Sequence, residues 1–239
     1  MSTAVSAAQQ LTCAIPLLVV LSAIRLIAGG GNFGVQLSRF LGLSAKATDQ
    51  LASVFAASVQ VRDGTTLLGL MLLVIFALGL AQAHQRFYEL TWCVDAPNRR
   101  LWHRHARWVG GVLAYAFALG AVARMLGGAA AARPVFIAIC APITAAFYWW
   151  SQLTLLAGRV PARSLIPGAV ITSLGVSGLL VISPWWVSNQ ITSSVREFGA
   201  IGVTFVLAAW QLVLSTLVLA GTLAGAVIVN HRHGVPAGM

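Results

Sequence analysis

The chain has 239 residues, of which 59% are hydrophobic and only 8% are charged. A soluble domain carries roughly 25% charged residues, so this composition excludes an ordinary water-soluble globule. The formal net charge of +10 comes from arginines, and in an apolar chain such an excess is typical of segments that face anionic lipid. A nucleic-acid interface is the alternative, but it needs basic residues clustered with aromatic platforms on a folded face.

Long apolar runs predict one membrane domain over residues 1–239. A helix needs about 20 mostly apolar residues to cross a hydrocarbon core of about 30 Å. The predicted fold class is all-α: a polytopic membrane protein with about six transmembrane helices and one amphipathic interfacial helix. The six spans are predicted at residues 11–28, 66–83, 109–123, 134–157, 166–181 and 198–229.

The first apolar run follows an N-terminus without a positively charged region, so we expect a retained span rather than a cleaved signal. Arg25 lies near the far end of this run. An arginine there usually extends to the membrane surface, and the alternative is an inward-facing Arg25 that lines a cavity.

The segment after the first span is too polar to cross a membrane. Ser44 is a predicted N-cap. Apolar side chains share one helical face, opposite a polar face, which predicts an amphipathic helix at the membrane surface. The apolar face holds Leu51, Val54, Phe55 and Val59, and the polar face holds Lys46, Asp49 and Gln50. Such a helix either packs over the bundle, which is the commoner arrangement, or acts as a lid.

The stretch from His84 to Trp108 holds five of the 14 arginines, two of the five acids and three of the five histidines. We interpret it as a solvated basic loop with tryptophans at the membrane surface. Basic residues mark cytoplasmic loops, so we predict that both termini face the cytoplasm. The cytoplasmic face would then hold Arg86, Arg99, Arg100, Arg104, Arg107, Arg159, Arg163 and Arg232, against Arg25, Arg39, Lys46, Arg62, Arg124, Arg133 and Arg196 opposite.

The later spans contain prolines and glycines at informative positions. Pro167 suits the first turn of the fifth span, which is predicted to close at the aromatic sequence Ser183-Pro184-Trp185-Trp186. The last span is too long to cross perpendicularly, so it should tilt or extend beyond the membrane. The spacing of Gly221 and Gly225 predicts close helix packing, either within the bundle or in a dimer.

No pattern in the sequence predicts an enzyme, a cofactor or a metal site. There is no Ser-His-Asp order, glycine-rich phosphate loop or HExxH. The two His-x-His pairs, at 103–105 and 231–233, each enclose an arginine, and alternate residues point apart on a helix. A histidine patch that titrates near neutral pH is left open.

The candidate substrate-binding residues are polar side chains in or beside the spans: Arg25, Arg86, Glu89, Gln152 and Gln211. Glu89 and Asp95 lie among arginines, so neutralising those arginines is the simpler role for both. The remaining polar residues of the spans are expected to bond between helices; they are Thr172, Ser173, Thr204, Ser215 and Thr216.

Three short motifs resemble the YihY/virulence factor BrkB family. Leu165-Ile166-Pro167-Gly168-Ala169 is similar to its LLPGA element, and Phe198-Gly199-Ala200-Ile201-Gly202 with Trp210 is similar to the start of its last helix. Gln85-Arg86-Phe87-Tyr88-Glu89 resembles the segment leading into its cytoplasmic loop. The resemblance covers roughly residues 65–229. The chain departs from the family at Gly221-Thr222-Leu223, where the family reads Gly-Ala-Glu, and it lacks the early AYY element.

The resemblance implies a six-helix protein of the bacterial inner membrane with both termini inside. It also implies a role in envelope integrity or in moving lipid-like or small solutes. Members have been labelled ribonuclease BN, and nothing in this sequence supports a nuclease.

Two functional hypotheses follow. The first is a transporter or flippase-like protein for a lipid or a small amphipathic or anionic solute. The second is a non-catalytic scaffold that binds partner proteins. Under both hypotheses the bilayer and its anionic lipids are the partners, nucleic acid is not, and self-association into a homo-oligomer is left open.

Overall fold

The computed structural model describes residues 35, 37–38, 41–57, 67–95, 102–126 and 133–232, and these contain helices and short turns but no strand. The elements are α3 (Ala45–Ala57), α4 (Leu67–Thr91), α5 (Trp102–Met125), α6 (Arg133–Leu156), the 3-10 turn η3 (Ala162–Leu165), α7 (Ile166–Phe198) and α8 (Ala200–Arg232). The predicted all-α class is confirmed for this part of the chain.

Four segments among the described residues are long and apolar enough to cross a membrane: Trp102–Met125, Arg133–Leu156, Ala162–Phe198 and Phe205–His231. The chain is therefore compatible with a multi-pass membrane protein. The predicted first span, residues 11–28, lies outside the described residues, as does Arg25. The predicted span 66–83 corresponds to α4, and its place in a membrane stays a prediction.

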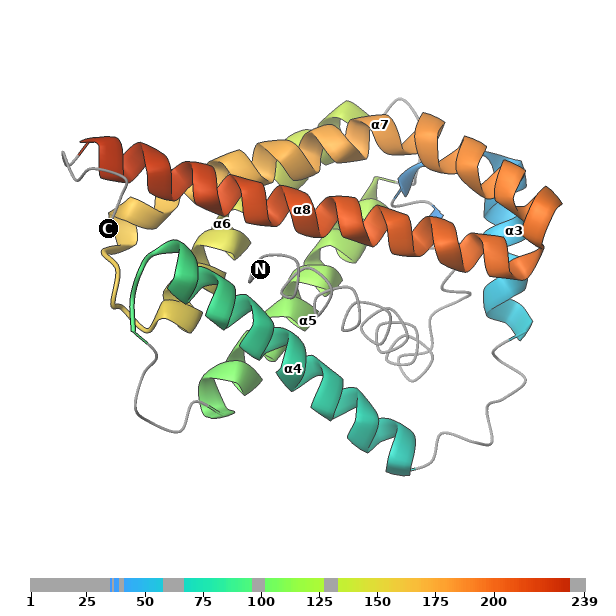
Figure 1. Ribbon diagram of the computed structural model, residues 1–239. Helices are drawn as coiled ribbons and strands as arrows, with labels where there is room; N and C mark the ends of the chain where they lie inside the picture. The colour runs from blue at the N-terminus through green and yellow to red at the C-terminus, as the bar shows by residue number, and fades with distance from the viewer. Residues whose placement is uncertain are drawn as a thin grey trace.

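Helices α7 and α8 are 33 residues each and form a long antiparallel hairpin. The chain reverses at Gly199, whose φ of +60° lies in the left-handed region that favours glycine. Figure 1 shows the two helices side by side, with α4 below them and oblique to the hairpin, and α3 beside the tip of the hairpin. Helix α6 packs on α7, and α5 packs on α6.

The tightest contact between α7 and α8 is made by glycines. A Cβ on Gly225 would lie 2.3 Å from Cα of Gly168, and a Cβ on Gly221 would lie 2.9 Å from Cα of Thr172. Real Cβ atoms do not approach backbone so closely, so these positions need glycine. The Gly221/Gly225 face therefore packs within the bundle, which decides between the two alternatives left open by the sequence.

The prediction that the fifth span closes at Ser183–Trp186 is wrong as a helix boundary, because α7 continues through Pro184 to Phe198. A proline inside a helix removes one N–H and leaves a carbonyl one turn earlier without its helical partner. Here that carbonyl is Leu180 O, which accepts a hydrogen bond from Arg133 Nη2 and lies 2.9 Å from Ser183 Oγ. The single Ser183 hydroxyl hydrogen can be donated either to Leu180 O or to Leu41 O, so Arg133 is the donor that replaces the missing N–H, and the helix continues.

Helix α3 has the predicted amphipathic character. Ser44 Oγ accepts a hydrogen bond from the N–H of Ala47 at 3.4 Å, as expected of an N-cap. Leu51 is fully buried and belongs to the same hydrophobic cluster as Ile191 of α7, whereas Lys46 and Asp49 are exposed. The side chains of Val54, Phe55 and Val59 lie outside the described set. Helix α3 packs over the bundle, and its contact with a membrane surface stays a prediction.

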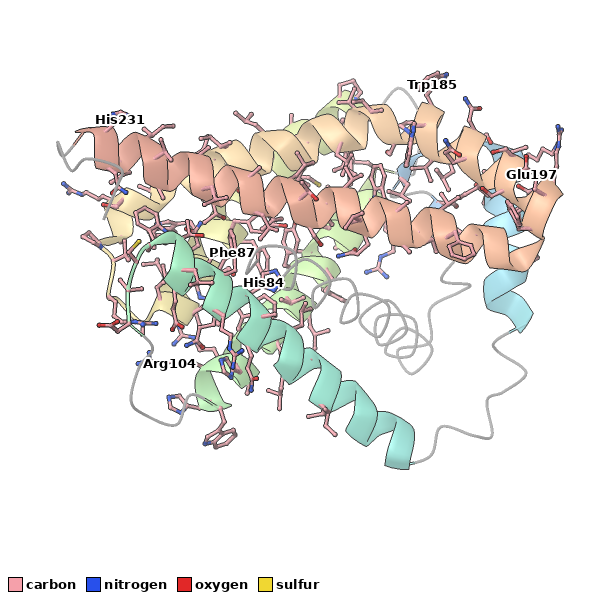
Figure 2. All side chains as sticks on the ribbon, in the orientation of Figure 1. His84, Phe87, Arg104, Trp185, Glu197 and His231 are labelled. Atoms are coloured by element: carbon pink, nitrogen blue, oxygen red, sulfur yellow. The ribbon has the colours of Figure 1, made fainter. Side chains whose placement is uncertain are left out.

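The described parts of three segments that the sequence assigned to one membrane face, the end of α4, the α6–α7 turn and the end of α8, meet at one end of the bundle. Arg159, in the α6–α7 turn, bonds to Glu89 in the last turns of α4 and to Asp95 just after α4, and η3 contacts both α7 and α8. We call this the basic end. Figure 2 places Arg104 and His231 towards it, and Trp185 and Glu197 towards the opposite, hairpin-tip end. That the basic end faces the cytoplasm stays a prediction.

Candidate functional site

Four polar side chains form a continuous hydrogen-bonded chain at the basic end. His105 Nε2 lies 2.6 Å from Gln85 Oε1, and Gln85 Nε2 donates to Glu89 Oε1 at 2.7 Å. Arg159 Nη2 donates to the same Glu89 oxygen at 2.6 Å, which completes an ion pair. We call these residues the polar chain. It connects α4, α5 and the α6–α7 turn.

Local helix geometry brings these residues together. Gln85 and Glu89 are four residues apart on α4, so they lie on one face of that helix. Helix α6 ends at Leu156, and the next two residues, Ala157 and Gly158, have left-handed φ values of +59° and +74°. This reversal directs Arg159 back over the helix end, where its Nε donates to Leu156 O at 2.8 Å.

This part of the chain corrects the predicted basic loop. Residues 84–91 are the last turns of α4 and residues 102–108 are the first turns of α5, so the stretch is mostly helical. Several of its polar residues point inward, where they satisfy one another rather than water. Gln85, Glu89 and His105 are at most 8% exposed. The interpretation of His84–Trp108 as a solvated loop is therefore wrong over both helical parts.

The charge of Arg159 fixes the direction of every bond in the polar chain. An ionised Glu89 can only accept hydrogen bonds, so the Gln85 amide must turn its NH₂ group towards it. The Gln85 carbonyl oxygen then faces His105, whose Nε2 must carry a proton and donate. The arrangement thus holds His105 either as the Nε2–H tautomer or as the imidazolium.

A second set of contacts surrounds Ser151 of α6, one layer deeper. Trp108 Nε1 donates to Ser151 Oγ at 2.7 Å, and the Tyr88 hydroxyl lies 3.4 Å from the same oxygen. The His84 ring lies 5.1 Å from the Trp108 ring. One serine therefore ties α4, α5 and α6 together beneath the polar chain.

Replacing Ser151 with alanine should destabilise the protein by about 1–3 kcal/mol, because Trp108 Nε1 loses its acceptor while it stays buried. Thermal unfolding in detergent, followed by circular dichroism, measures the change. Ser193→Ala is the matched control, since the Ser193 hydroxyl is exposed and bonds only to its own helix. The control should stay within about 0.5 kcal/mol of the unchanged protein. Equal stability of both variants would contradict the assigned role of Ser151.

Arginines surround the polar chain on the outside of the basic end. Arg86, Arg107 and Arg163 are exposed, and Arg104 is half-buried. The Arg107 guanidinium lies over the Trp150 ring at 5.9 Å from its centroid. This combination of cations with an aromatic ring suits the headgroup region of a membrane, where anionic lipids carry the opposite charge.

The structure places the predicted site residues in different parts of the bundle. Glu89 is central to the polar chain, whereas Arg86, three residues earlier, is on the exposed side of α4. Gln152 is 1% exposed; its Nε2 donates to Tyr148 O at 3.4 Å, and its Oε1 has no hydrogen-bond partner. Gln211 is half-buried on α8 beside Trp210, far along the hairpin from the basic end.

Sequence reasoning missed three members of the polar chain: Gln85, His105 and Arg159. The spacing of Gln85 and Glu89 was the one local signal, since such a pair often bonds along a helix face. The Glu89 prediction, that it neutralises an arginine, is confirmed, but its partner is Arg159 rather than an arginine of its own stretch.

No group of three or more histidine, cysteine, aspartate or glutamate residues that could hold a metal occurs in the described part of the chain. His103 is exposed while His105 is buried, so this His-x-His pair points apart on α5 as helix geometry requires. Cys93 and Cys140 are free thiols.

These features define a class: an all-helical chain, compatible with a multi-pass membrane protein, with a polar chain at one end of its bundle. No family model, curated protein or solved structure matches the chain. The resemblance to the YihY/virulence factor BrkB family therefore stays a prediction.

Proposed function

We propose that the protein is a transporter or flippase-like protein of the bacterial inner membrane, with no catalytic activity, both termini in the cytoplasm, and a lipid or a small amphipathic anion as substrate. The observation that supports this proposal best is the partly buried Glu89–Arg159 ion pair. It joins α4 to the α6–α7 turn at the end of the bundle where the exposed arginines gather.

A buried ion pair adds little to stability on balance, because the cost of removing both charges from water offsets their attraction. Such a pair can instead hold two segments in one of two arrangements. Arg159 bonds at once to Glu89, to Asp95 O and to Leu156 O. Losing this one guanidinium from the pair would free the C-terminal end of α4 from the α6–α7 turn.

An anionic substrate is the natural competitor for this pair. The Arg159 side chain is 22% exposed, whereas that of Glu89 is 10% exposed. A guanidinium binds carboxylate and phosphate oxygens through the same forked geometry. A phosphate or carboxylate that reaches the basic end can therefore replace Glu89 on Arg159, and this exchange would open the connection between the two segments.

The second candidate is a scaffold that holds partner proteins. Its motivation is now narrower, because the Gly221/Gly225 face that could have bound a partner is occupied by Gly168 and Thr172 of the same chain. Only the exposed arginines of the basic end remain for that role. A partner that co-purifies in stoichiometric amount, and is lost from an Arg86→Gln, Arg107→Gln, Arg163→Gln variant, would favour the scaffold.

Reconstituted vesicles test the transporter. The protein in phosphatidylcholine vesicles should accelerate the movement of a fluorescent anionic lipid, phosphatidylglycerol, or the release of small organic anions. Arg159→Gln should change that rate by at least about tenfold, because it removes the group that exchanges partners. Arg196→Gln, an exposed arginine at the opposite end, should leave it unchanged. Absence of flux across lipid and anion panels would contradict the proposal.

A further inference from the structure

The α7–α8 hairpin is too long to lie within the hydrocarbon core of a bilayer. Each helix has 33 residues, which at 1.5 Å per residue is about 50 Å. The hydrocarbon core is about 30 Å thick. Even at a tilt of about 40°, the largest usual value, the hairpin would still extend over about 38 Å of depth. One end of it must therefore project.

The projecting end is the hairpin tip. In α7, residues 166–182 contain no charged residue, whereas residues 188–197 are mostly polar: Ser188, Asn189, Gln190, Thr192, Ser193, Ser194, Arg196 and Glu197. The change occurs at the aromatic sequence after Pro184. Trp185 is 72% exposed there, and Trp186 stacks on Trp210 of α8 with ring centroids 6.2 Å apart. Tryptophans gather at membrane–water boundaries, so this level marks the boundary.

Beyond that boundary, α3 completes a small three-helix unit. Leu41, Ala47 and Leu51 are at most 1% exposed and share one hydrophobic cluster with Val187, Ile191 and Val203. We call residues 41–57, 187–198 and 200–209 the cap. Figure 1 shows α3 beside the hairpin tip, at the end of α7 and α8 away from the C-terminus. The buried side chains of the cap belong to one cluster with Leu119 of α5 and Phe136 of α6, so the cap packs directly on the bundle. Its exposed face is polar along α3 and α7, beside the exposed Phe198 and Phe205.

Arg133, at the start of α6, fastens the cap to the spanning helices. Its Nη2 donates to Leu41 O and to Ser183 Oγ, both at 2.9 Å, and also to Leu180 O. Ser183 Oγ donates to the same Leu41 oxygen at 2.7 Å. Next along the chain, the Ser44 N–H donates to Ser188 Oγ at 3.0 Å.

The turn at Leu41 and Gly42 leaves space for the Arg133 guanidinium because it contains a glycine. Gly42 has a left-handed φ of +69°, and a Cβ at this position would lie 1.6 Å from Nη1 of Arg133. The guanidinium therefore lies directly against the glycine backbone. Within the described residues no carboxylate pairs with Arg133, so its bonds in this region are to backbone carbonyls and one hydroxyl. Arg133 thus serves the attachment of the turn rather than an ion pair.

We propose that the cap lies outside the bilayer over the bundle end opposite the basic end, and that Arg133 is the latch that holds it closed. The location and the latch do not depend on transport. If the protein is a transporter, as proposed above, the cap closes the exit that faces away from the basic end. The two ends would then carry separate latches, Glu89–Arg159 and Arg133.

Labelling of single cysteines tests the location. Cys13, Cys93 and Cys140 are first replaced by serine in the full chain, and Ser193→Cys and Val181→Cys are compared in membrane vesicles. Both positions are exposed on α7, but they lie on opposite sides of the Trp185 level. A membrane-impermeant maleimide should label Ser193→Cys from one side only and leave Val181→Cys unreacted. Equal labelling of the two, or no labelling of Ser193→Cys, would overturn the location.

Hydrogen exchange tests the latch. In Arg133→Gln, the amides of residues 41–57 should exchange at least about tenfold faster, because local opening of the cap becomes easier. The amides of α4 and α5 near the polar chain should not change. Arg124→Gln, an exposed arginine on α5, is the control. Unchanged exchange in residues 41–57, or a uniform increase over all helices, would overturn the latch.

Ser183→Ala provides a second variant if Arg133→Gln does not fold. It removes one donor to Leu41 O and one acceptor of Arg133, and it leaves the arginine in place. A smaller increase in exchange, confined to the same segment, is the expected result. No change in that segment would overturn the latch. Neither exchange experiment involves flux, so failure of the vesicle assay would contradict the transporter and leave the cap intact.

Discussion

Arg159→Ala should destabilise the folded protein by about 3 kcal/mol, the lower part of the range for breaking a buried ion pair. The lower part applies because the Arg159 side chain is 22% exposed, so water can partly replace it. The cost arises mainly at Glu89, which keeps its charge in a buried position with Gln85 as its remaining donor. Arg159→Lys should cost less, because a lysine restores the charge but not all the N–H donors that bond to Asp95 O and Leu156 O.

A double-mutant cycle with Glu89→Gln separates the pair from its surroundings. If the two side chains act together, the double variant should be more stable than the sum of the single effects predicts, by about 1–3 kcal/mol. Thermal unfolding in a mild detergent gives each free energy. Arg163→Ala, an exposed arginine in the neighbouring 3-10 turn, should change stability by at most about 0.5 kcal/mol. Strict additivity of the two single effects would contradict a direct interaction between Glu89 and Arg159.

Hydrophobic runs predicted the long apolar helices well where residues close to each helix end determine that end. The span predicted at 134–157 is observed as α6 at Arg133–Leu156, and Pro167 lies in the first turn of α7 as expected. Burial in lipid requires long apolar helices, so the pattern and the structure have the same physical cause. The prediction is weakest where polar residues satisfy each other inside helices.

The polar chain illustrates that weakness. His105 and Gln85 are 20 positions apart, and Arg159 and Glu89 are 70 positions apart. Periodicity detects neighbours along one helix, whereas these contacts depend on how three segments pack. A cluster of charged and aromatic residues then resembles a solvated loop, although Gln85, Glu89 and His105 are buried. Only Glu89 could be nominated from sequence, through its position among arginines.

Pro184 shows the same limit for a helix boundary. The usual rule that proline ends a helix assumes that the freed carbonyl goes to water. In this chain the freed carbonyl is Leu180 O, and Arg133, 47 positions before Leu180, donates to it. The aromatic sequence at Ser183–Trp186 predicted the end of the fifth span where we now infer the membrane boundary, but α7 itself continues to Phe198. The helix continues because a distant side chain satisfies the backbone.

Gly225→Leu should abolish the folded bundle, and Gly225→Ala should destabilise it by about 1–3 kcal/mol. An added Cβ would lie 2.3 Å from Cα and 2.4 Å from N of Gly168. Backbone atoms cannot move aside as a flexible side chain can, so α7 and α8 must separate along their length. The loss of close packing is costly in a membrane, where packing rather than the hydrophobic effect holds helices together.

Gly178→Ala is the matched control for this prediction. Gly178 is also inside a spanning helix, α7, but no heavy atom lies within 4 Å of the position that its Cβ would take. Alanine favours the helix over glycine by up to about 1 kcal/mol, so this variant should be as stable as the unchanged protein or slightly more so. Unfolding of both variants in detergent, together with their yield after purification, measures the difference. If Gly225→Ala were as stable as Gly178→Ala, the two helices could not be as close as 2.3 Å implies, and Gly225 would be free to serve a contact between two copies of the chain.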